Sequence, residues 1–313
     1  MDKNLYAHYF RKLASLLSLL IIVILLSILS PYFFTTENLF SIGLQMAVIA
    51  IMSIGQMWII ISGGIDLSVG SVLALSGVVS TLLISSGFDI LTASLVGIMV
   101  GSLCGVISGF LISAGKLPPF IATLGMMGIA RGMALILTKG VPVFGLPESF
   151  SVISNGRIAN LVPIPILITL LLALIGHIIL TRTPFGRYTY AIGSNFEAAR
   201  LSGIRTSRTL IYIYTLGGML SGLAGIILAS RLSTGQPTAG TGYELDVIAA
   251  CVIGGASLSG GAGTIWGAIL GALLIGVLRN GCNLMDISAF WQQVAIGALI
   301  VIAVFIDQYQ KNR

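Results

Sequence analysis

The chain has 313 residues, of which 56% are hydrophobic and 8% are charged, and its formal net charge is +6. This composition excludes an ordinary water-soluble globular protein. Apolar runs of about twenty residues recur along the whole length, which favours a polytopic helical membrane protein over a membrane barrel. Most Lys and Arg lie where the positive-inside rule places cytoplasmic charge, so the positive balance indicates orientation rather than nucleic-acid binding.

Ten apolar segments follow one another along the chain and leave no stretch for a soluble domain. The first follows a charged start, as in a signal peptide, but it lacks a small-residue cleavage site and is interpreted as a retained helix. The segment at 245–257 is shorter than the roughly twenty residues that span a bilayer, which predicts a broken or partly re-entrant helix. We expect one all-α transmembrane domain over residues 1–313, with about ten transmembrane helices at 13–30, 42–62, 68–85, 90–114, 119–137, 161–180, 210–230, 245–257, 264–277 and 288–306.

The distribution of charge predicts which side of the membrane each loop occupies. With the N-terminus inside, ten spans place Lys116, the loop Thr181–Thr209 and the basic C-terminus in the cytoplasm, which accounts for eleven of the sixteen Lys and Arg. Both termini are therefore expected to be cytoplasmic. With an odd number of spans, the two basic termini would lie on opposite sides of the membrane, against the positive-inside rule.

The loop Thr181–Thr209 interrupts the apolar pattern and holds five of the sixteen Lys and Arg. Within it, Ser194-Asn195 offers a helix cap and Gly203 a helix stop, which predicts one short helix outside the bilayer. Two interpretations are open from these residues: a solvated loop that only fixes topology, and a docking surface for a cytoplasmic partner. The five basic residues are Arg182, Arg187, Arg200, Arg205 and Arg208.

Glycines recur every four residues in three segments, which gives each segment a face that another backbone can approach closely. The spacing fits packing within the chain or an interface between subunits, and packing within the chain is the simpler interpretation. The glycines concerned are Gly97, Gly101, Gly105 and Gly109, then Gly218 and Gly222, and then Gly263, Gly267 and Gly271.

Two glycine-rich turns, at 61–71 and 252–262, share the frame GGxxLSxG at the predicted cytoplasmic ends of their spans. Glycines break a helix there and free backbone groups, which is tolerated only in the protein interior or beside a water-filled cavity. The turns are therefore candidates for the transport path or its inner gate. Alternatively, they are tight turns in which Ser68 and Ser259 cap the next helix. The candidate residues are Gly63, Gly64, Asp66, Ser68, Gly254, Gly255 and Ser259.

The sequence carries no motif for catalysis, nucleotide binding or metal binding. It has no GxxxxGK[ST], HExxH or GxSxG pattern, and its three Cys and two His do not cluster. Only Asp66, Arg131 and Arg279 approach intramembrane positions, and they do not form the relay of an ion-coupled carrier. Arg131 is interpreted as snorkelling or pairing with a carboxylate at the outer surface. We expect no catalytic residue, metal or cofactor on this chain, so the use of ATP requires a partner chain.

Five stretches, taken together and in order, resemble the membrane permeases of bacterial ABC sugar importers. The resemblance is to the branch that serves ribose, xylose, arabinose, methyl-galactoside and autoinducer-type sugars, and within it most of all to the ribose permeases. The stretches are SGGIDLSVGS from Ser62, PFIATLGMM from Pro119, FGRYTYAIGSNFEAARLSGI from Phe185, QPTAGTGYELDVIAACVIGGASLSGGAG from Gln236, and GALLIGVLRNGCNLM from Gly271.

The resemblance implies a ten-helix permease of the bacterial inner membrane that works as a pair, with a homodimer as the expected form. Two cytoplasmic ABC ATPases would hold ATP and Mg, and an extracytoplasmic sugar-binding protein would deliver the sugar and set most of the specificity. The loop Thr181–Thr209 would carry the coupling helix that docks on the ATPase. The residues that the resemblance assigns to it are Gly186, Arg187, Gly193, Asn195, Glu197, Ala198, Ala199, Arg200, Leu201 and Gly203.

Three positions depart from the family pattern. Cys251 and Cys282 stand where members are small or aliphatic, and Arg279 stands where an uncharged residue is expected, so the sugar path is not drawn through these residues. The alternatives to an importer subunit are a secondary sugar carrier or facilitator that works without an ATPase, and a receptor or scaffold that binds a cytoplasmic protein. Flux that depends on ATP and on a partner ATPase distinguishes the importer from both.

Overall fold

The computed structural model describes residues 3–158 and 162–311. The predicted start of one span at Leu161 and the terminal residues 1–2 and 312–313 lie outside this part of the chain. The described elements are α1 (Lys3–Leu29), α2 (Thr36–Ile61), α3 (Val69–Ser85), α4 (Ile90–Ser113), α5 (Pro119–Thr138), α6 (Glu148–Asn155), β1 (Arg157–Ile158), β2 (Val162–Pro163), α7 (Ile164–Arg182), α8 (Pro184–Ser194), α9 (Phe196–Leu201), α10 (Thr206–Leu232), α11 (Tyr243–Ile253), α12 (Ile265–Leu284) and α13 (Ala289–Lys311).

Each of the ten predicted apolar segments overlaps one of these helices, in the predicted order. Within the described residues, six helices are long and apolar enough to cross a membrane, namely α2, α4, α5, α7, α10 and α12. Two features were not predicted. The stretch between α5 and α7 forms the short helix α6 and a small antiparallel hairpin, β1–β2, and the polar loop forms two helices, α8 and α9, rather than one.

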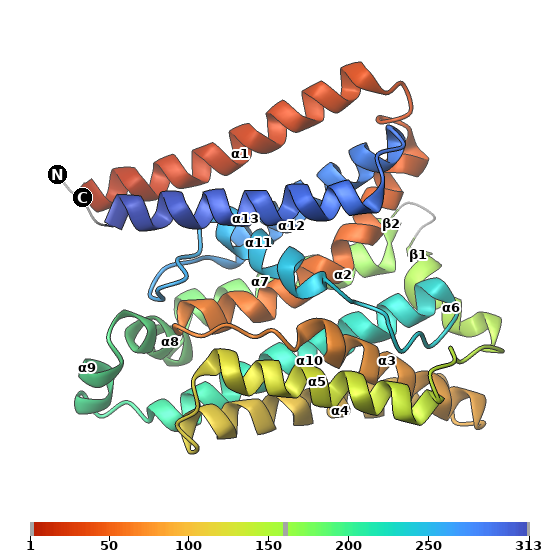
Figure 1. Ribbon diagram of the computed structural model, residues 1–313, viewed down its shortest axis with the longest axis horizontal. Helices are drawn as coiled ribbons and strands as arrows, with labels where there is room; N and C mark the ends of the chain where they lie inside the picture. The colour runs from red at the N-terminus through yellow and green to blue at the C-terminus, as the bar shows by residue number, and fades with distance from the viewer. Residues whose placement is uncertain (1–2, 159–161, 312–313) are drawn as a thin grey trace.

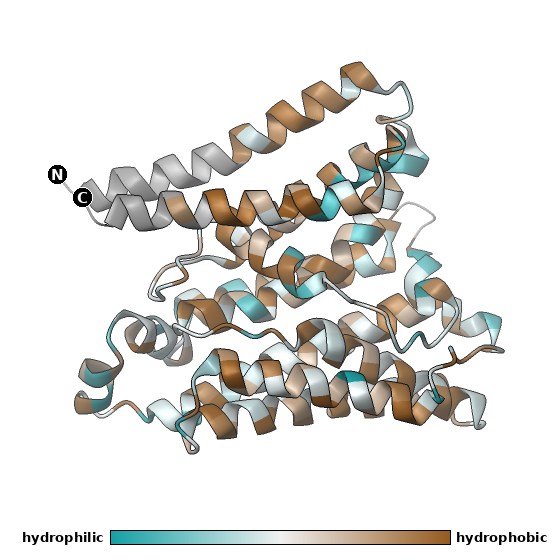
Figure 2. Ribbon diagram, in the orientation of Figure 1, coloured by the Kyte–Doolittle hydropathy of each residue, from teal (hydrophilic) through white to brown (hydrophobic). Residues whose placement is uncertain are grey.

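Figure 1 shows most helices lying along the long axis of one bundle. At one end, which we call the α9 end, lie α8, α9, the beginning of α1 and the end of α13. At the other, the α6 end, lie α6 and the β1–β2 hairpin. Figure 2 shows hydrophilic colour on α9 and near the start of α6, whereas α1, α4 and α13 are mostly hydrophobic along their described lengths. This distribution suits a bundle whose sides face lipid and whose ends face water.

Two of the predicted spans are interrupted helices. α2 ends at the α9 end, the non-helical stretch 62–68 returns into the bundle, and α3 then runs to the α6 end (Figure 1). The stretch 233–242 likewise returns from the α6 end after α10, and α11 continues towards the α9 end. α11 has 11 residues, which confirms the prediction that the segment at 245–257 is too short for a continuous spanning helix.

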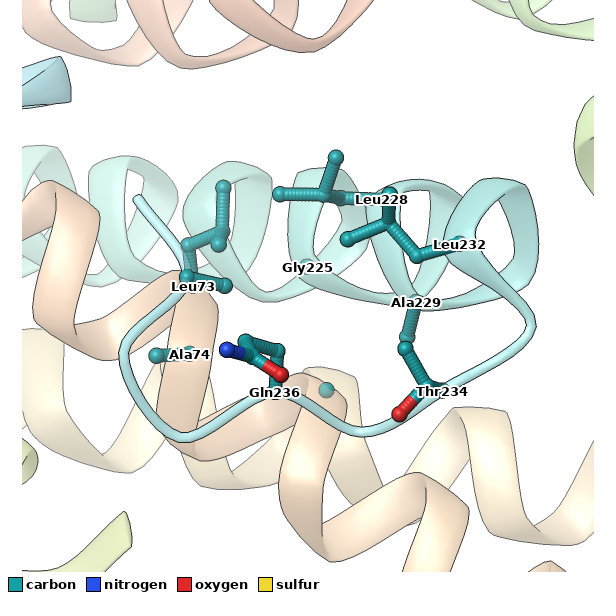
Figure 3. Close-up of a pocket in the computed structure, with 10 residues that line it drawn as sticks. Leu73, Ala74, Gly225, Leu228, Ala229, Leu232, Thr234 and Gln236 are labelled. Carbon is teal, nitrogen blue, oxygen red and sulfur yellow. The ribbon is translucent and has the colours of Figure 1, made fainter. Parts of the chain in front are cut away.

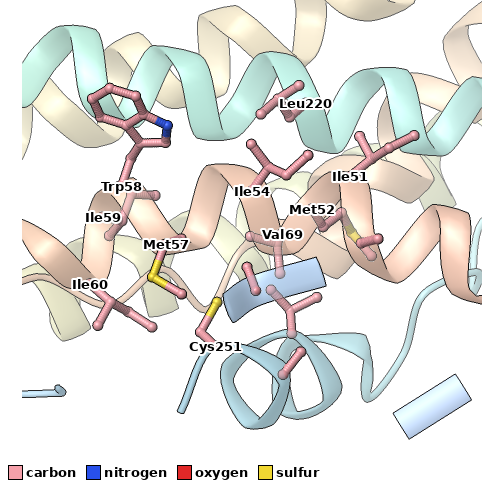
Figure 4. Close-up of a cluster of buried hydrophobic side chains, with 14 of the residues drawn as sticks. Ile51, Met52, Ile54, Met57, Trp58, Ile59, Ile60, Val69, Leu220 and Cys251 are labelled. Carbon is pink, nitrogen blue, oxygen red and sulfur yellow. The ribbon is translucent and has the colours of Figure 1, made fainter. Parts of the chain in front are cut away.

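The core is built on α2, whose apolar side chains point to every side. Ile54, Met57 and Trp58 are buried, and they lie among Val69 of α3, Leu220 of α10 and Cys251 of α11 (Figure 4). The most apolar window of α2 is 83% buried, compared with 22% for α7. A helix that is hydrophobic all round is expected at the centre of a membrane bundle, since peripheral helices expose one face to lipid.

The regularly spaced glycines mediate packing within the chain. Gly101 lies against Gly218 and Gly222, and Gly105 lies against the backbone of Tyr214, so α4 and α10 approach with almost no side chain between them. On α12, Gly267 and Gly271 face the backbones of Gly254 and Ala250 in the same way. The prediction of packing inside the chain is thus confirmed for these residues.

Adding one methyl group at the α4–α10 contact is expected to destabilise the protein. In Gly105→Ala, the new Cβ would overlap the carbonyl oxygen of Tyr214, and such overpacking costs about 1–3 kcal/mol. The control is Gly297→Ala on α13, where a Cβ meets no described atom within 4 Å and where alanine favours the helix. Thermal unfolding of the detergent-purified chain should show a lower midpoint for Gly105→Ala only. Equal midpoints for the two variants would contradict the packing described here.

Candidate functional site

Helix α8 begins where Thr183 and Pro184 stop α7 and start a new helix. The Thr183 side chain accepts a hydrogen bond from the amide of Gly186 at 3.4 Å, and Pro184 occupies the first turn, where its missing N–H costs nothing. Gly186 is buried against the end of α7, since a Cβ there would overlap the carbonyl oxygen of Leu180. These residues fold the chain sharply back over the end of α7.

Helix α9 follows with the caps that the sequence predicts. Asn195 Oδ1 accepts a hydrogen bond from the amide of Ala198 at 2.9 Å, and Gly203 ends the segment with a φ of 84°, a conformation that favours glycine. Glu197 and Arg200 form an ion pair of 2.8 Å on the outer face of α9, and both side chains are more than half exposed. An ion pair this exposed adds little stability, so both charges are available to a partner.

The structure divides the predicted coupling residues into an exposed and a packed group. Leu201 is 77% exposed. The exposed group is Arg187, Asn195, Glu197, Ala198, Arg200, Leu201 and Gly203, and the packed group is Gly186, Gly193 and Ala199. The first group lies at the surface, whereas the second packs the α8–α9 segment against the bundle.

The packed face of α8 meets both glycine-rich turns. A side chain at Gly193 would overlap the carbonyl oxygen of Ile61 and lie 2.7 Å from the amide nitrogen of Gly261. That same amide donates a hydrogen bond of 2.9 Å to the Ile61 oxygen. A Cβ on Gly260 would lie 3.0 Å from the Cα atoms of both Gly193 and Gly63. We call this meeting of three backbone segments the glycine junction.

Two further contacts fix α8 against the same elements. The Tyr190 hydroxyl donates a hydrogen bond of 2.7 Å to the carbonyl oxygen of Gly263, in the stretch between α11 and α12. Phe185 stacks on Trp58 of α2 with ring centroids 5.1 Å apart. The α8 helix is therefore attached to the end of α2 and to the α11–α12 turn at once.

The first turn is held by side chains that replace the missing helical hydrogen bonds. Asp66 is buried, and its Oδ1 accepts hydrogen bonds from the Ser68 amide at 2.7 Å and the Ser68 hydroxyl at 2.6 Å. With its amide oriented to satisfy both groups, Gln56 bonds the backbone N–H and carbonyl of Asp66 at 3.1 and 3.3 Å. The Thr123 hydroxyl reaches the Ile65 carbonyl at 3.2 Å. Backbone freed by the break in the helix is thereby satisfied inside the protein.

Of the two serines interpreted as helix caps, Ser68 occupies the N-cap position of α3, whereas Ser259 does not cap α12. The Ser68 side chain makes no capping bond to α3, because its hydroxyl donates to Asp66 instead. The cap of α12 is Thr264, whose Oγ1 accepts from the Gly267 amide at 3.0 Å, five residues beyond Ser259. Gly254 packs against the backbone of Gly267, and Gly255 continues the turn after α11.

A cleft of about 950 Å³ opens beside the glycine junction at the α9 end. Its lining includes Gly63, Gly64 and Ser259 from the turns, and Gly193, Glu197 and Arg200 from the α8–α9 segment. The Tyr214 hydroxyl is buried at its wall next to Gly64 and has no hydrogen-bond partner among the described residues. We call this the inner cleft. The structure thus brings part of both predicted residue groups into one site, while Asp66, Ser68, Gly254 and Gly255 do not line it.

The second interrupted helix is held by Arg131 of α5. Its Nη1 donates to the carbonyl oxygens of Pro237 and Ala239 at 2.6 and 2.9 Å, so it supports the non-helical stretch 233–242 rather than pairing with a carboxylate. Figure 3 shows Gln236 of this stretch lying between Leu73 and Ala74 of α3 and the residues of α10 around a small cavity. An arginine inside the bundle thereby satisfies the carbonyls of an unwound segment.

Sequence reasoning missed an ion pair in the same region. Both carboxylate oxygens of Asp246, on α11, accept hydrogen bonds from Nη2 of Arg279, on α12, at 2.7 and 2.8 Å. The Asp246 side chain is 1% exposed. The pair joins residues 33 positions apart, for which the sequence offers no local signal. The importance of Gln56, Tyr190 and Tyr214 was missed for the same reason.

The fold and the site define a class of protein: a multi-pass helical membrane protein with interrupted helices and an exposed polar segment at one end. Residues 38–304 match the family described as branched-chain amino acid transport system / permease component. The chain therefore belongs to this family of permease components.

Curated relatives of the chain are permeases for sugars. The ribose import permease protein RbsC of Bacillus subtilis (strain 168) is 46% identical over 95% of this chain and 93% of the relative. The RbsC protein of Escherichia coli (strain K12) is 44% identical over 94% of this chain and 92% of the relative. The D-allose transport system permease protein AlsC of the same strain is 37% identical over 97% and 93%. The resemblance to ABC sugar permeases is thus confirmed. No solved structure matches the chain.

A methyl group at the glycine junction should detach α8 from the turns. In Gly193→Ala, the new Cβ would overlap the Ile61 carbonyl, and the resulting strain of about 1–3 kcal/mol should favour local opening of α8. Hydrogen exchange of the amides at 184–194 should then accelerate by about 5- to 150-fold, because each 1.4 kcal/mol changes the open fraction tenfold. Ala198→Ser, at an exposed position on α9, is the control. Unchanged exchange in Gly193→Ala would show that the junction does not hold α8.

Proposed function

We propose that this chain is the transmembrane permease subunit of an ATP-binding cassette importer that moves a monosaccharide, with ribose as the preferred substrate, across the bacterial inner membrane. The identities of 46% and 44% to two ribose import permeases, compared with 37% to a D-allose permease, support this choice of sugar. Hydrolysis of ATP belongs to a separate ATPase subunit, which would hold ATP and Mg. A periplasmic sugar-binding protein delivers the sugar.

In this proposal, residues 1–313 form one permease domain with ten membrane crossings, and the α9 end faces the cytoplasm. Eight crossings are made by α1, α2, α4, α5, α7, α10, α12 and α13. The other two are made by the stretches 62–68 and 233–242 together with α3 and α11. Irregular backbone at membrane depth is tolerated because Gln56, Thr123 and Arg131 satisfy it. Both termini then lie in the cytoplasm with the basic loop, as the positive-inside rule favours.

The glycine junction is the observation that carries the proposal. The exposed side chains of Glu197, Arg200 and Leu201 form the surface on which an ATPase docks, and Gly193, on the packed side of the same segment, touches both turns. A displacement of α8 by the ATPase therefore acts directly on the turns that line the inner cleft. ATP shifts the permease between two states only if the docked ATPase contacts α8 and α9 differently in each state.

The permease is proposed to work with a second copy of itself. On α5, Gly125, Gly128 and Gly132 share one side, and a Cβ at any of them would meet no described atom within 4 Å. Small residues on an uncovered side of a membrane helix allow close approach of another helix. This side of α5 is the surface that we assign to the pair.

Sugar uptake by reconstituted proteoliposomes tests the proposed function. Vesicles that contain the chain, its ATPase and the binding protein should accumulate labelled ribose only when ATP is present on the side of the ATPase. The double variant Glu197→Lys/Arg200→Glu keeps an ion pair within α9 but reverses both charges towards a partner, so it should lower ATPase co-purification and uptake at least about tenfold. Lys139→Glu, exposed beyond the C-terminal end of α5, is the matched control.

Two results would contradict the proposal. Equal uptake by vesicles that hold only this chain, without ATP, would identify the secondary carrier or facilitator. ATPase binding without any ATP-dependent flux would identify a scaffold.

A further inference from the structure

A second cleft, of about 430 Å³, opens at the α6 end of the bundle, and none of its lining residues lines the inner cleft. We call it the outer cleft. Its walls come from α2, α10, α11, α12, α13 and the stretch 233–242. Polar side chains in its lining include Gln45, Arg231, Tyr243, Arg279, Asn283 and Gln292.

The outer cleft runs from the α6 end of the bundle to about half its depth. Arg231 lies one residue before the end of α10, Asn283 lies one residue before the end of α12, and Ala289 begins α13, all at the α6 end (Figure 1). Tyr243 and Asp246 begin α11 in the interior. The outer cleft therefore ends at the interrupted helix formed by 233–242 and α11, and the inner cleft ends at the one formed by 62–68 and α3. The buried cluster of Figure 4 lies around α2 and α11.

The Asp246–Arg279 pair forms the closed part of the outer cleft. The Asp246 side chain is 1% exposed, and both of its carboxylate oxygens accept hydrogen bonds from Arg279. The Arg279 side chain, in contrast, is 29% exposed. A buried ion pair is a poor source of stability, because desolvation offsets the attraction between the charges. The pair does, however, fix the Arg279 guanidinium at the wall of the cleft, where the buried Asp246 carboxylate neutralises its charge.

The remaining polar groups suit a molecule with many hydroxyls. Gln292 Nε2 donates to Asn283 Oδ1 at 2.8 Å and Gln45 Nε2 donates to Ser41 Oγ at 3.3 Å. The Asn283 amide nitrogen can still donate to a ligand and the Gln45 amide oxygen can still accept from one, and Tyr243 adds a phenol. Because the Asp246 carboxylate neutralises Arg279, the charged residues that line the cleft have a net charge of one positive unit, from Arg231. An anion only accepts hydrogen bonds, whereas each hydroxyl of a sugar does both, so the mixture of donors and acceptors favours a neutral polyol. The volume is within the range of about 300–1,000 Å³ that is usual for small-molecule sites.

We infer that the outer cleft binds a neutral polyhydroxylated molecule of monosaccharide size, held by the Asp246-oriented guanidinium of Arg279 and by the amides of Gln45 and Asn283. This permease then contacts the sugar itself, on the side from which the binding protein delivers it. Arg279 departs from the family pattern and was not expected on the sugar path, whereas this inference includes it, because its guanidinium lies at the wall of the cleft. The direction of entry and the choice of ribose as probe rest on the proposed function, whereas the existence of the site does not.

The experiment measures ribose binding to the full chain in lipid nanodiscs, without ATPase, by saturation-transfer NMR. Ribose should receive saturation from the protein, and Ala289→Trp, which places a large ring at the exposed mouth of the cleft, should weaken binding at least about tenfold. Asn283→Leu should also weaken it without disturbing the ion pair. Ala298→Trp, at an exposed position on the same helix that does not line the cleft, should have no effect.

The outcomes separate this inference from the proposed function. Absence of ribose binding, binding that Ala289→Trp leaves unchanged, or displacement of ribose by inorganic phosphate would overturn the inference, even if the reconstituted transporter still imports ribose. Binding that Ala289→Trp abolishes would support the outer cleft, even if ATP-driven uptake fails and the proposed function falls.

Discussion

The close contact of three backbone segments at the glycine junction is the constraint on which the rest of the structure depends. Gly193 packs against the hydrogen-bonded Ile61 carbonyl and Gly261 amide, and it can do so only because it has no side chain. Through this contact, the exposed α8–α9 segment lies directly on the end of α2 and on the α11–α12 turn. Backbone-to-backbone contact leaves no flexible side chain to absorb a displacement, and closely packed interiors transmit strain. The exposed charges of α9 and the inner cleft therefore belong to one mechanical unit.

The two interrupted helices explain most of the polar residues inside the bundle. Each break frees backbone groups that a membrane interior cannot satisfy with water. Gln56 and Thr123 satisfy the first break, and Arg131 satisfies the second. Arg131 is thus a structural support rather than a group that carries charge across the membrane. The breaks also run in opposite directions along the bundle, which places one cleft at each end (Figure 1).

Hydropathy and capping rules predicted the features that depend on neighbouring residues. The apolar segments were found because each helix that meets lipid must be apolar over its length, and the cap of α9 was found because Asn195 lies three residues before the amide that it bonds. Helix α8 was missed, although Thr183-Pro184 is a recognisable helix start. The short length of the segment at 245–257 correctly indicated a broken helix.

Contacts between residues that are far apart in the chain could not be predicted from the sequence. Gly193 and Gly261 are far apart in the chain, and nothing near either glycine indicates that they meet. Asp246 and Arg279 are 33 residues apart, so their pairing appears only when α11 and α12 are packed together. The two turns were recognised as a pair from their shared frame, but only the structure separates Gly63, Gly64 and Ser259, which line the inner cleft, from the buried Asp66.

Movement of α8 is expected to reach the inner cleft through the glycine junction. Nitroxide labels on cysteines introduced at Lys116 and Ser259, two exposed positions on the lining, report the width of the cleft after Cys282 is replaced by Ser. In the complete transporter, the distance distribution between the labels should differ between the nucleotide-free and ATP-trapped states, and Gly193→Ala should abolish that difference while the ATPase remains bound. The same distribution in both nucleotide states, or a change that persists in Gly193→Ala, would contradict the account.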